Sequence, residues 1–132
     1  QAEFSALCDA QATRPALQDM ATVVQARLGE WRELSAEVIT ACQRDLQEIG
    51  ATSVDFLQYS AYVLLAGFWL QAATRAQDAL ESGSGEAAFY QAKLHSADFY
   101  LRRVLPRASA HRDALLGGAD CLMAMAEDSF AF

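Results

Sequence analysis

Proline and glycine, the residues that interrupt helices, are scarce in this sequence, with two and seven copies among 132 residues. Alanine is abundant, and the β-branched residues never gather into an alternating run. Because alanine propagates helices and proline breaks them, this composition favours long helices over strands. Hydrophobic residues make up 53% of the chain, which excludes a disordered protein. We therefore expect an all-α domain with a packed core.

Positive charge is also scarce. Ten basic residues stand against 17 acidic ones, which gives a net charge of −7, and Lys93 is the only lysine. Nucleic-acid binding needs a clustered excess of positive charge, so we predict no nucleic-acid partner. The most apolar stretch, Tyr62 to Leu70, is about half the length that crosses a bilayer, so we expect no membrane partner either.

Paired cysteines are absent. Cys8, Cys42 and Cys121 lie far apart, with no CxxC spacing and no disulfide framework, which favours a reduced, cytoplasmic protein. Residues 1–12 lack the basic start and apolar run of a signal peptide. The chain starts at Gln1 rather than Met, so we expect a piece or a processed product of a longer protein.

Helical spacing dominates what is present. Residues 2–12 predict a short leading helix, and Pro15 sits where the next helix would begin. Apolar residues then recur in steps of three or four at Leu17, Met20, Val24, Leu28, Trp31, Leu34, Val38, Cys42, Leu46 and Ile49. This period predicts one helix to Ile49, with Gly50 as its stop. We divide the chain into a leading helix with linker, 1–14, and a helical bundle, 15–132.

A second long helix is expected from a cap at Thr52 or Ser53 to about Glu81. Its middle, Phe56 to Trp69, is apolar on nearly every side, which is typical of a central helix surrounded by others. Gly67 lies inside this stretch, where a glycine costs about 1 kcal/mol against alanine. We expect a close helix crossing there.

Two further helices follow the flexible linker at 82–85. One runs from Glu86 to about Leu105, where Pro106 ends or kinks it. The other starts near Ser109 and carries Leu115, Leu116, Ala119, Leu122, Met123 and Ala126, and Gly117-Gly118 bends it or marks close packing. The tail, 129–132, is expected to fray unless its two phenylalanines dock. The fold class is thus an up-and-down bundle of four main helices with a short leading helix.

Reactive side chains form no recognisable constellation. Neither His95 nor His111 follows a Glu-x-x-His pattern, and no glycine-rich phosphate motif occurs. Cys42 and Cys121 lie on apolar stripes, where cysteine acts as a small hydrophobe. We predict no catalytic, cofactor-binding or metal-binding residue in this chain.

One locally basic stretch surrounds Pro106. Its members are Arg102, Arg103, Arg107, His111 and Arg112. One interpretation is an anion site or an interface with an acidic partner, for instance the phosphates of a CoA group. The other is a set of solvated cations placed favourably near a helix C-terminus. The second arrangement is routine in helical proteins.

Three stretches, read in order, resemble a known family. They are YVLLAGFWLQAATRAQ at 62–77, FYQAKLHSADFYLRRVLPRA at 89–108 and LLGGADCLMAMAEDSF at 115–130. Together they are similar to the extra C-terminal helical domain of certain bacterial acyl-CoA dehydrogenases, the group that includes 3-methylmercaptopropionyl-CoA dehydrogenase. Cys121 departs from the pattern, where a small polar residue is expected.

The resemblance implies a parent enzyme that oxidises an acyl-CoA to a trans-2-enoyl-CoA with FAD. Its carboxylate base and its flavin-binding residues belong to other domains, and none of them maps onto this sequence. The implied partners are the remainder of the parent enzyme and other copies in a homo-oligomer. A stand-alone helical interaction module and a small-ligand or metal-binding bundle remain the competing hypotheses.

Overall fold

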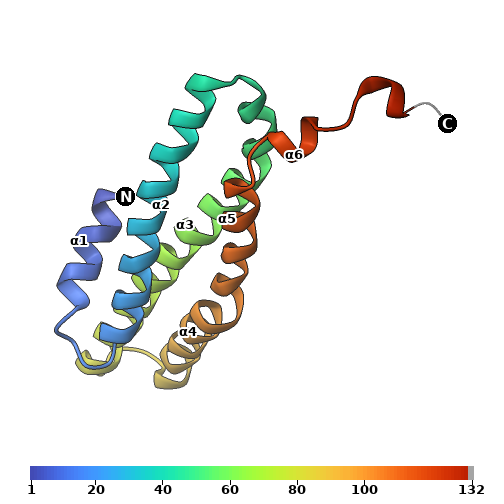
Figure 1. Ribbon diagram of the computed structural model, residues 1–132. Coiled ribbons are helices and arrows are strands. Elements are labelled where there is room, and N and C mark those ends of the chain that lie inside the picture. The colour runs from blue at the N-terminus through green and yellow to red at the C-terminus, as the bar shows by residue number, and fades with distance from the viewer. Residues whose placement is uncertain (131–132) are drawn as a thin grey trace.

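The computed structural model describes residues 1–130, so the last two residues of the predicted 15–132 bundle, and with them part of the tail prediction, lie outside it. Within that range the chain forms helices and no strand, which confirms the all-α fold class (Figure 1). The helices are α1 Ala2–Gln11, α2 Gln18–Arg44, α3 Gln47–Ser82, α4 Ala87–Phe99, α5 Ala108–Leu116 and the single turn α6 Asp120–Met123.

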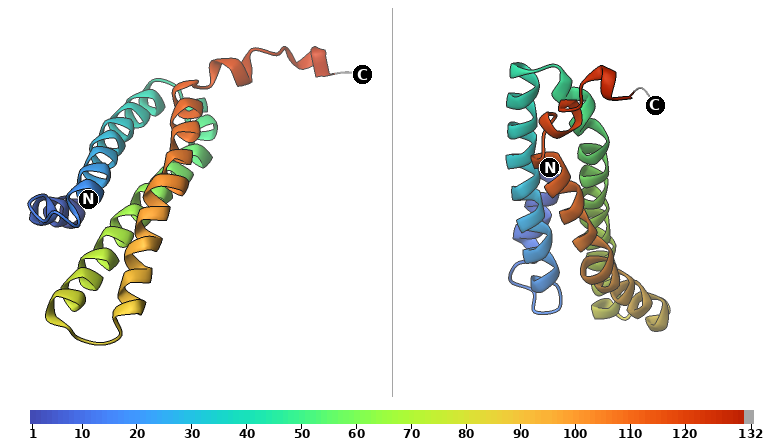
Figure 2. Two further views of the ribbon diagram at one scale, coloured as in Figure 1. Left: turned by 90° about the horizontal axis from the view of Figure 1, so that it is seen from below. Right: turned by 45° about the vertical axis from the view of Figure 1, so that its right-hand side comes forward.

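The helices alternate in direction around α3. The short leading helix α1 turns back into α2, α2 turns back into α3, and α4 runs back along α3 (Figures 1 and 2). α3 contacts α1, α2, α4 and α5, which confirms that it is the central helix, although these helices do not surround it on every side. α5 runs in the same direction as α4 and does not turn back. The two helices together form the α4–α5 segment, which lies antiparallel to α3 (Figure 2).

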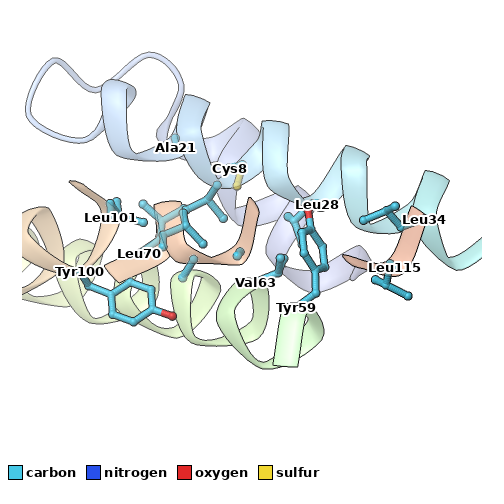
Figure 3. Packing of buried hydrophobic residues seen from close by; sticks show 14 residues of the cluster. Cys8, Ala21, Leu28, Leu34, Tyr59, Val63, Leu70, Tyr100, Leu101 and Leu115 are labelled. Atoms are coloured by element: carbon cyan, nitrogen blue, oxygen red, sulfur yellow. The ribbon is translucent and has the colours of Figure 1, made fainter. Parts of the chain in front are cut away.

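The core lies along one side of α3. Tyr59, Val63 and Leu70 of α3 are fully buried, as are Val24 and Leu28 of α2 to within 1%. Residues from α1, from the segment 100–105 that follows α4 and from α5 complete this cluster (Figure 3). Burying a side chain of this size stabilises the fold by about 1.5–3 kcal/mol, which makes this layer the main source of stability.

The crossing expected at Gly67 is present. A Cβ atom placed on Gly67 would lie 2.7 Å from ring carbons of Phe4. The phenyl ring of the leading helix therefore rests directly on the backbone of α3. Any larger side chain at position 67 would have to displace the Phe4 ring.

The predicted boundary between the first two long helices is wrong. α2 ends at Arg44, Asp45 is extended, and the chain re-enters a helix at Gln47. The Gln47 N–H donates to the Asp45 carboxylate over 2.9 Å, so Asp45 starts α3 in place of the predicted caps, Thr52 and Ser53. Gly50 lies inside α3 rather than stopping α2. The apolar period failed as a guide here because it continued across the break with Leu46 and Ile49, which are both exposed.

Pro106 kinks its helix, which is one of the two outcomes predicted for it, an end or a kink. The preceding residues, Tyr100–Val104, widen into a π-helical segment, and Leu105–Arg107 form one 3-10 turn before α5. The Leu105 N–H donates to the carbonyl of Tyr100, five residues back. Proline has no N–H to donate and its ring crowds the preceding turn, which accounts for the change of winding.

The predicted fourth helix is wrong in its second half. α5 ends at Leu116, and Gly118 takes a left-handed φ of 62°. The next backbone N–H, that of Ala119, donates to the Glu48 carboxylate over 3.1 Å and ties this turn to the start of α3. Leu122 and Met123 consequently leave the core and are more than half exposed.

Candidate functional site

The five basic residues predicted as a patch do not converge on one site. Arg102 pairs with Asp98 over 2.6 Å on the exposed surface of the bundle. His111 and Arg112 turn instead toward α3 and α2, where they contact carboxylates. Arg103 and Arg107 are exposed and make no ion pair within residues 1–130. Anion binding by this stretch stays a prediction.

Glu30 lies at the centre of a polar network that joins α2, α3 and α5. Its carboxylate accepts hydrogen bonds from the Tyr59 hydroxyl at 2.5 Å and from Arg27 at 2.6 Å. The Nε atom of Arg112 lies 2.8 Å from the other carboxylate oxygen of Glu30 and forms an ion pair with it. The N–H of this Nε atom makes no hydrogen bond. Burial by itself raises the pKa of Glu30, but these hydrogen bonds and cations outweigh it and lower the pKa.

Tyr59 is the buried member of that network. Burial, and then the hydrogen bond to the Glu30 carboxylate, raise the pKa of the phenol. Because Tyr59 is 0% exposed, no substrate can reach its hydroxyl. The network is therefore a tie between helices. The sequence shows only its local part, the Arg27–Glu30 spacing, since Tyr59 and Arg112 come from distant segments.

A second polar tie lies beside it. His111 Nδ1 and Asp55 Oδ1 are 2.8 Å apart, and the imidazole stacks on the Tyr62 ring with centroids 5.8 Å apart. The Tyr62 carbonyl in turn accepts a hydrogen bond from the Tyr100 hydroxyl over 2.9 Å. Both contacts attach the α4–α5 segment to α3. They explain the position of His111 without a ligand.

The cavity near the start of α3 does not suit the cofactor that the resemblance implies for the parent. A cavity of about 210 Å³ between α2, α3 and α5 is lined by Leu34, Val38 and Leu115 and carries the carboxylates Glu37 and Glu48. FAD has a pyrophosphate, which needs cations or the N–H groups of a helix N-terminus. Two carboxylates repel it, so these residues do not fit a flavin, and we assign no step of a reaction to them.

Two negative findings hold for the described part of the chain. No group of three or more His, Cys, Asp or Glu side chains lies close enough to hold a metal ion. None of the helices combines the length and the apolar character needed to span a bilayer.

The outer face of α3 is the most unusual surface of the domain. We define it as the exposed apolar residues on the side of α3 away from the core: Val54, Leu57, Ala61, Leu64, Leu65 and Phe68. The five larger side chains are between 36% and 67% exposed. No ionisable acid or base other than tyrosine occurs from Phe56 to Thr74. Neighbouring exposed apolar side chains of this kind are a feature by which interaction sites are recognised, which makes this face the candidate.

Neighbouring helices widen this surface at its C-terminal half. On one side the Phe4 ring of α1 meets Phe68 edge to face, with centroids 5.2 Å apart. On the other side a groove of about 360 Å³ runs between α3 and α4, lined by Trp69 and Lys93 among others. Lys93 lies 5.1 Å above the exposed Phe89 ring. The prediction that other helices surround α3 is therefore wrong on this side, which α1 and α4 border but do not cover.

Comparison with known families gives one match. The family model described as "Acetyl-CoA dehydrogenase C-terminal like" matches residues 1–126. That region includes every helix from α1 to α6, and with them the Glu30 network and the outer face of α3. A comparison with curated proteins finds no match.

Proposed function

Because the chain belongs to the acetyl-CoA dehydrogenase C-terminal-like family, we propose that it is the non-catalytic C-terminal auxiliary domain of an FAD-dependent acyl-CoA dehydrogenase. The parent enzyme is a cytoplasmic flavoprotein of the group similar to 3-methylmercaptopropionyl-CoA dehydrogenase. FAD there accepts a hydride from the β-carbon of an acyl-CoA, while a carboxylate base takes the α-proton. Both groups lie on other parts of the polypeptide, and this chain contributes neither.

The domain acts by packing on the main body of the enzyme or at subunit contacts. The outer face of α3 supports this role, because a helix this apolar on its exposed side is stabilised by a cover. Covering the exposed half of each large side chain contributes about 1 kcal/mol. The polar contacts of Glu30 and His111 support this role as well. They fix α3 to its neighbouring helices, and they engage titratable groups that a catalytic site would need.

The test is to isolate the complete polypeptide that contains residues 1–132. We expect in-frame coding sequence for several hundred further residues ahead of Gln1, bound flavin in the purified protein and acyl-CoA oxidation. Removing residues 1–132 should leave flavin binding measurable but lower the thermal stability or change the number of subunits. An open reading frame that starts just before Gln1, or a complete protein without flavin, would contradict the proposal.

A stand-alone helical interaction module is the second candidate, and the same outer face favours it. It predicts a specific protein partner for the chain in the absence of any flavoenzyme. Pull-down with the wild-type chain, against a Leu57→Lys variant as control, separates the two. The interaction module is favoured if the wild-type chain captures a specific protein that is no part of a flavoenzyme and the Leu57→Lys variant does not capture it.

A further inference from the structure

We propose that the outer face of α3 binds the outer face of α3 in a second copy of this chain, with the two helices antiparallel about a two-fold axis at Ala61. This inference rests on the proposed function and specifies one contact left open there, the contact between subunits. A two-fold contact requires a surface that is complementary to itself, so that residue i meets residue j and j meets i.

The order of side chains along the face meets that requirement. Counted from Ala61, position −7 is Val54 and position +7 is Phe68, and position −4 is Leu57 and position +4 is Leu65. All four are about half exposed or more. Because α3 is one continuous helix, residues at equal distances from Ala61 come to the same level in an antiparallel pair. Val54 then meets Phe68, and Leu57 meets Leu65, on both sides of the axis.

The small residue lies where two helices come closest. Ala61 would face its own copy, and its side chain permits the 8–10 Å approach of two packed helices. The bulkier residues on both sides then interdigitate. The remaining pair, Gln58 with Leu64, places a flexible amide at the edge, where it stays in contact with water.

Charge explains why this face is preferred over other surfaces. Each copy carries a net charge of −7, so most surfaces of two copies repel one another. The stretch from Phe56 to Thr74 carries no carboxylate and no strong cation, so the two paired helices bury no charge of their own, and Lys93 of α4 lies at the border of the contact. We therefore expect association to strengthen as salt screens the repulsion between the two bodies, the opposite of a contact built on ion pairs.

The face is modest in size. From Val54 to Phe68 it is about 21 Å long, at 1.5 Å per residue. Stable protein interfaces bury about 800 Å² on each partner, and permanent dimers bury more. One pair of helices offers less than this, so the chain alone is expected to dimerise weakly. In a complete enzyme, other subunit contacts raise the effective concentration of the two faces.

The test is sedimentation of the chain over a micromolar-to-millimolar series with charge-swap variants. Leu57→Lys and Leu65→Glu are each expected to weaken dimerisation about tenfold or more, because each places a charge against a leucine. In the double variant the introduced lysine of each copy lies against the introduced glutamate of the other, and we expect it to regain most of the loss. Circular dichroism is the control, and we expect it to show the same helix content in the variants as in the wild type. Double-variant dimers no stronger than those of the single variants would overturn the antiparallel register.

Crosslinking gives an independent measurement. In a Cys42→Ala/Cys121→Ser background, Ala61→Cys should form a disulfide-linked dimer under mild oxidation, because the axis places the two thiols opposite each other. Ala36→Cys, on the exposed side of α2, is the matched control and should remain monomeric. Equal crosslinking at the two positions would overturn the inference.

Failure here is distinguishable from failure of the proposed function. If the Ala61→Cys thiol is protected from maleimide in a flavin-containing complete enzyme but never crosslinks between copies, the main body covers α3. The self-pairing inference is then wrong and the auxiliary-domain proposal stands. If the complete protein lacks flavin, the auxiliary-domain proposal fails whatever the crosslinking shows.

Discussion

The two faces of α3 have similar hydrophobicity and opposite surroundings. On the inner face Tyr59, Val63 and Leu70 are 0% exposed, while on the outer face Leu57 is 66% and Phe68 is 55% exposed. Both faces belong to one helix, so helix propensity cannot account for the difference. What differs is the cover: α2, α5 and part of α4 close the inner face, and nothing within residues 1–130 closes the outer one. Hydrophobicity alone therefore does not tell whether a face of a helix is covered within its own chain.

The largest expected difference between the faces is in stability. Leu70→Ala removes a fully buried side chain and should lower the free energy of unfolding by about 2–5 kcal/mol, through lost burial and the cavity left behind. Urea denaturation followed by circular dichroism measures it. A loss below about 1 kcal/mol would mean that the inner face is not the stabilising layer.

The Glu30 network should give the next largest effect. Glu30→Gln keeps the shape but removes the charge that Arg27 and Arg112 face, and we expect a loss of about 1–3 kcal/mol at neutral pH. Because folding lowers the pKa of this carboxyl, its contribution is present above the unfolded pKa of about 4.3 and is lost as pH falls through the lower folded value. The wild type should therefore lose more stability than the variant on acidification. Parallel pH profiles would contradict this role.

Tyr100 extends the comparison to alkaline pH. Burial first, and then the nearby Tyr62, raise the pKa of Tyr100 to about 12. A raised pKa means that its contribution is complete below the unfolded value of about 10 and is lost as pH rises toward 12. Stability should fall over that window, and Tyr100→Phe should flatten the fall. Unfolding curves at pH 9 and pH 11 measure it, with Tyr90→Phe as the control.

Gly67 tests the edge where the two faces meet. Gly67→Ala gains about 1 kcal/mol of helix propensity but drives its methyl group against the Phe4 ring, and we expect a net loss of about 1 kcal/mol. In a Phe4→Ala background the clash is gone, and the same substitution should stabilise. A double-mutant cycle measures the change of sign. The same sign in both backgrounds would mean that α1 does not press on Gly67.

The smallest effect is expected on the outer face. Leu57→Ala should change the unfolding free energy of the monomeric chain by no more than about 0.5 kcal/mol, because the side chain already faces water. The matched comparison with Leu70→Ala uses the same chemical change in the same helix. Similar losses at the two positions would remove the distinction between the faces.

Local patterns predicted much of this fold. The leading helix, the central position of α3, the close crossing at Gly67 and the kink at Pro106 all follow from spacing and from backbone chemistry. The resemblance to the acyl-CoA dehydrogenase C-terminal domain is also confirmed at the level of the family. These features depend on residues near one another in sequence, or on a single residue with one physical property.

The failures share a cause. The apolar period ran across the α2–α3 break because Leu46 and Ile49 continue the spacing on residues that the fold leaves exposed. The fourth helix was extended because Leu122 and Met123 suit a helix, whereas the Glu48 carboxylate that ties the turn at Ala119 comes from far away in the sequence. Glu30 was missed for the same reason. The openness of the outer face depends on the packing of α1 and α4 beside α3, which no local pattern records.

The most direct test is the reactivity of a thiol on the outer face of α3. In a Cys42→Ala/Cys121→Ser background, Leu57→Cys should react with maleimide in the dilute 132-residue chain as fast as Ser84→Cys in the exposed linker. In the complete enzyme we predict that Leu57→Cys reacts at least about tenfold more slowly while Ser84→Cys keeps its rate, because a protein surface then covers α3. Equal rates for Leu57→Cys in the chain and in the complete enzyme would contradict the account.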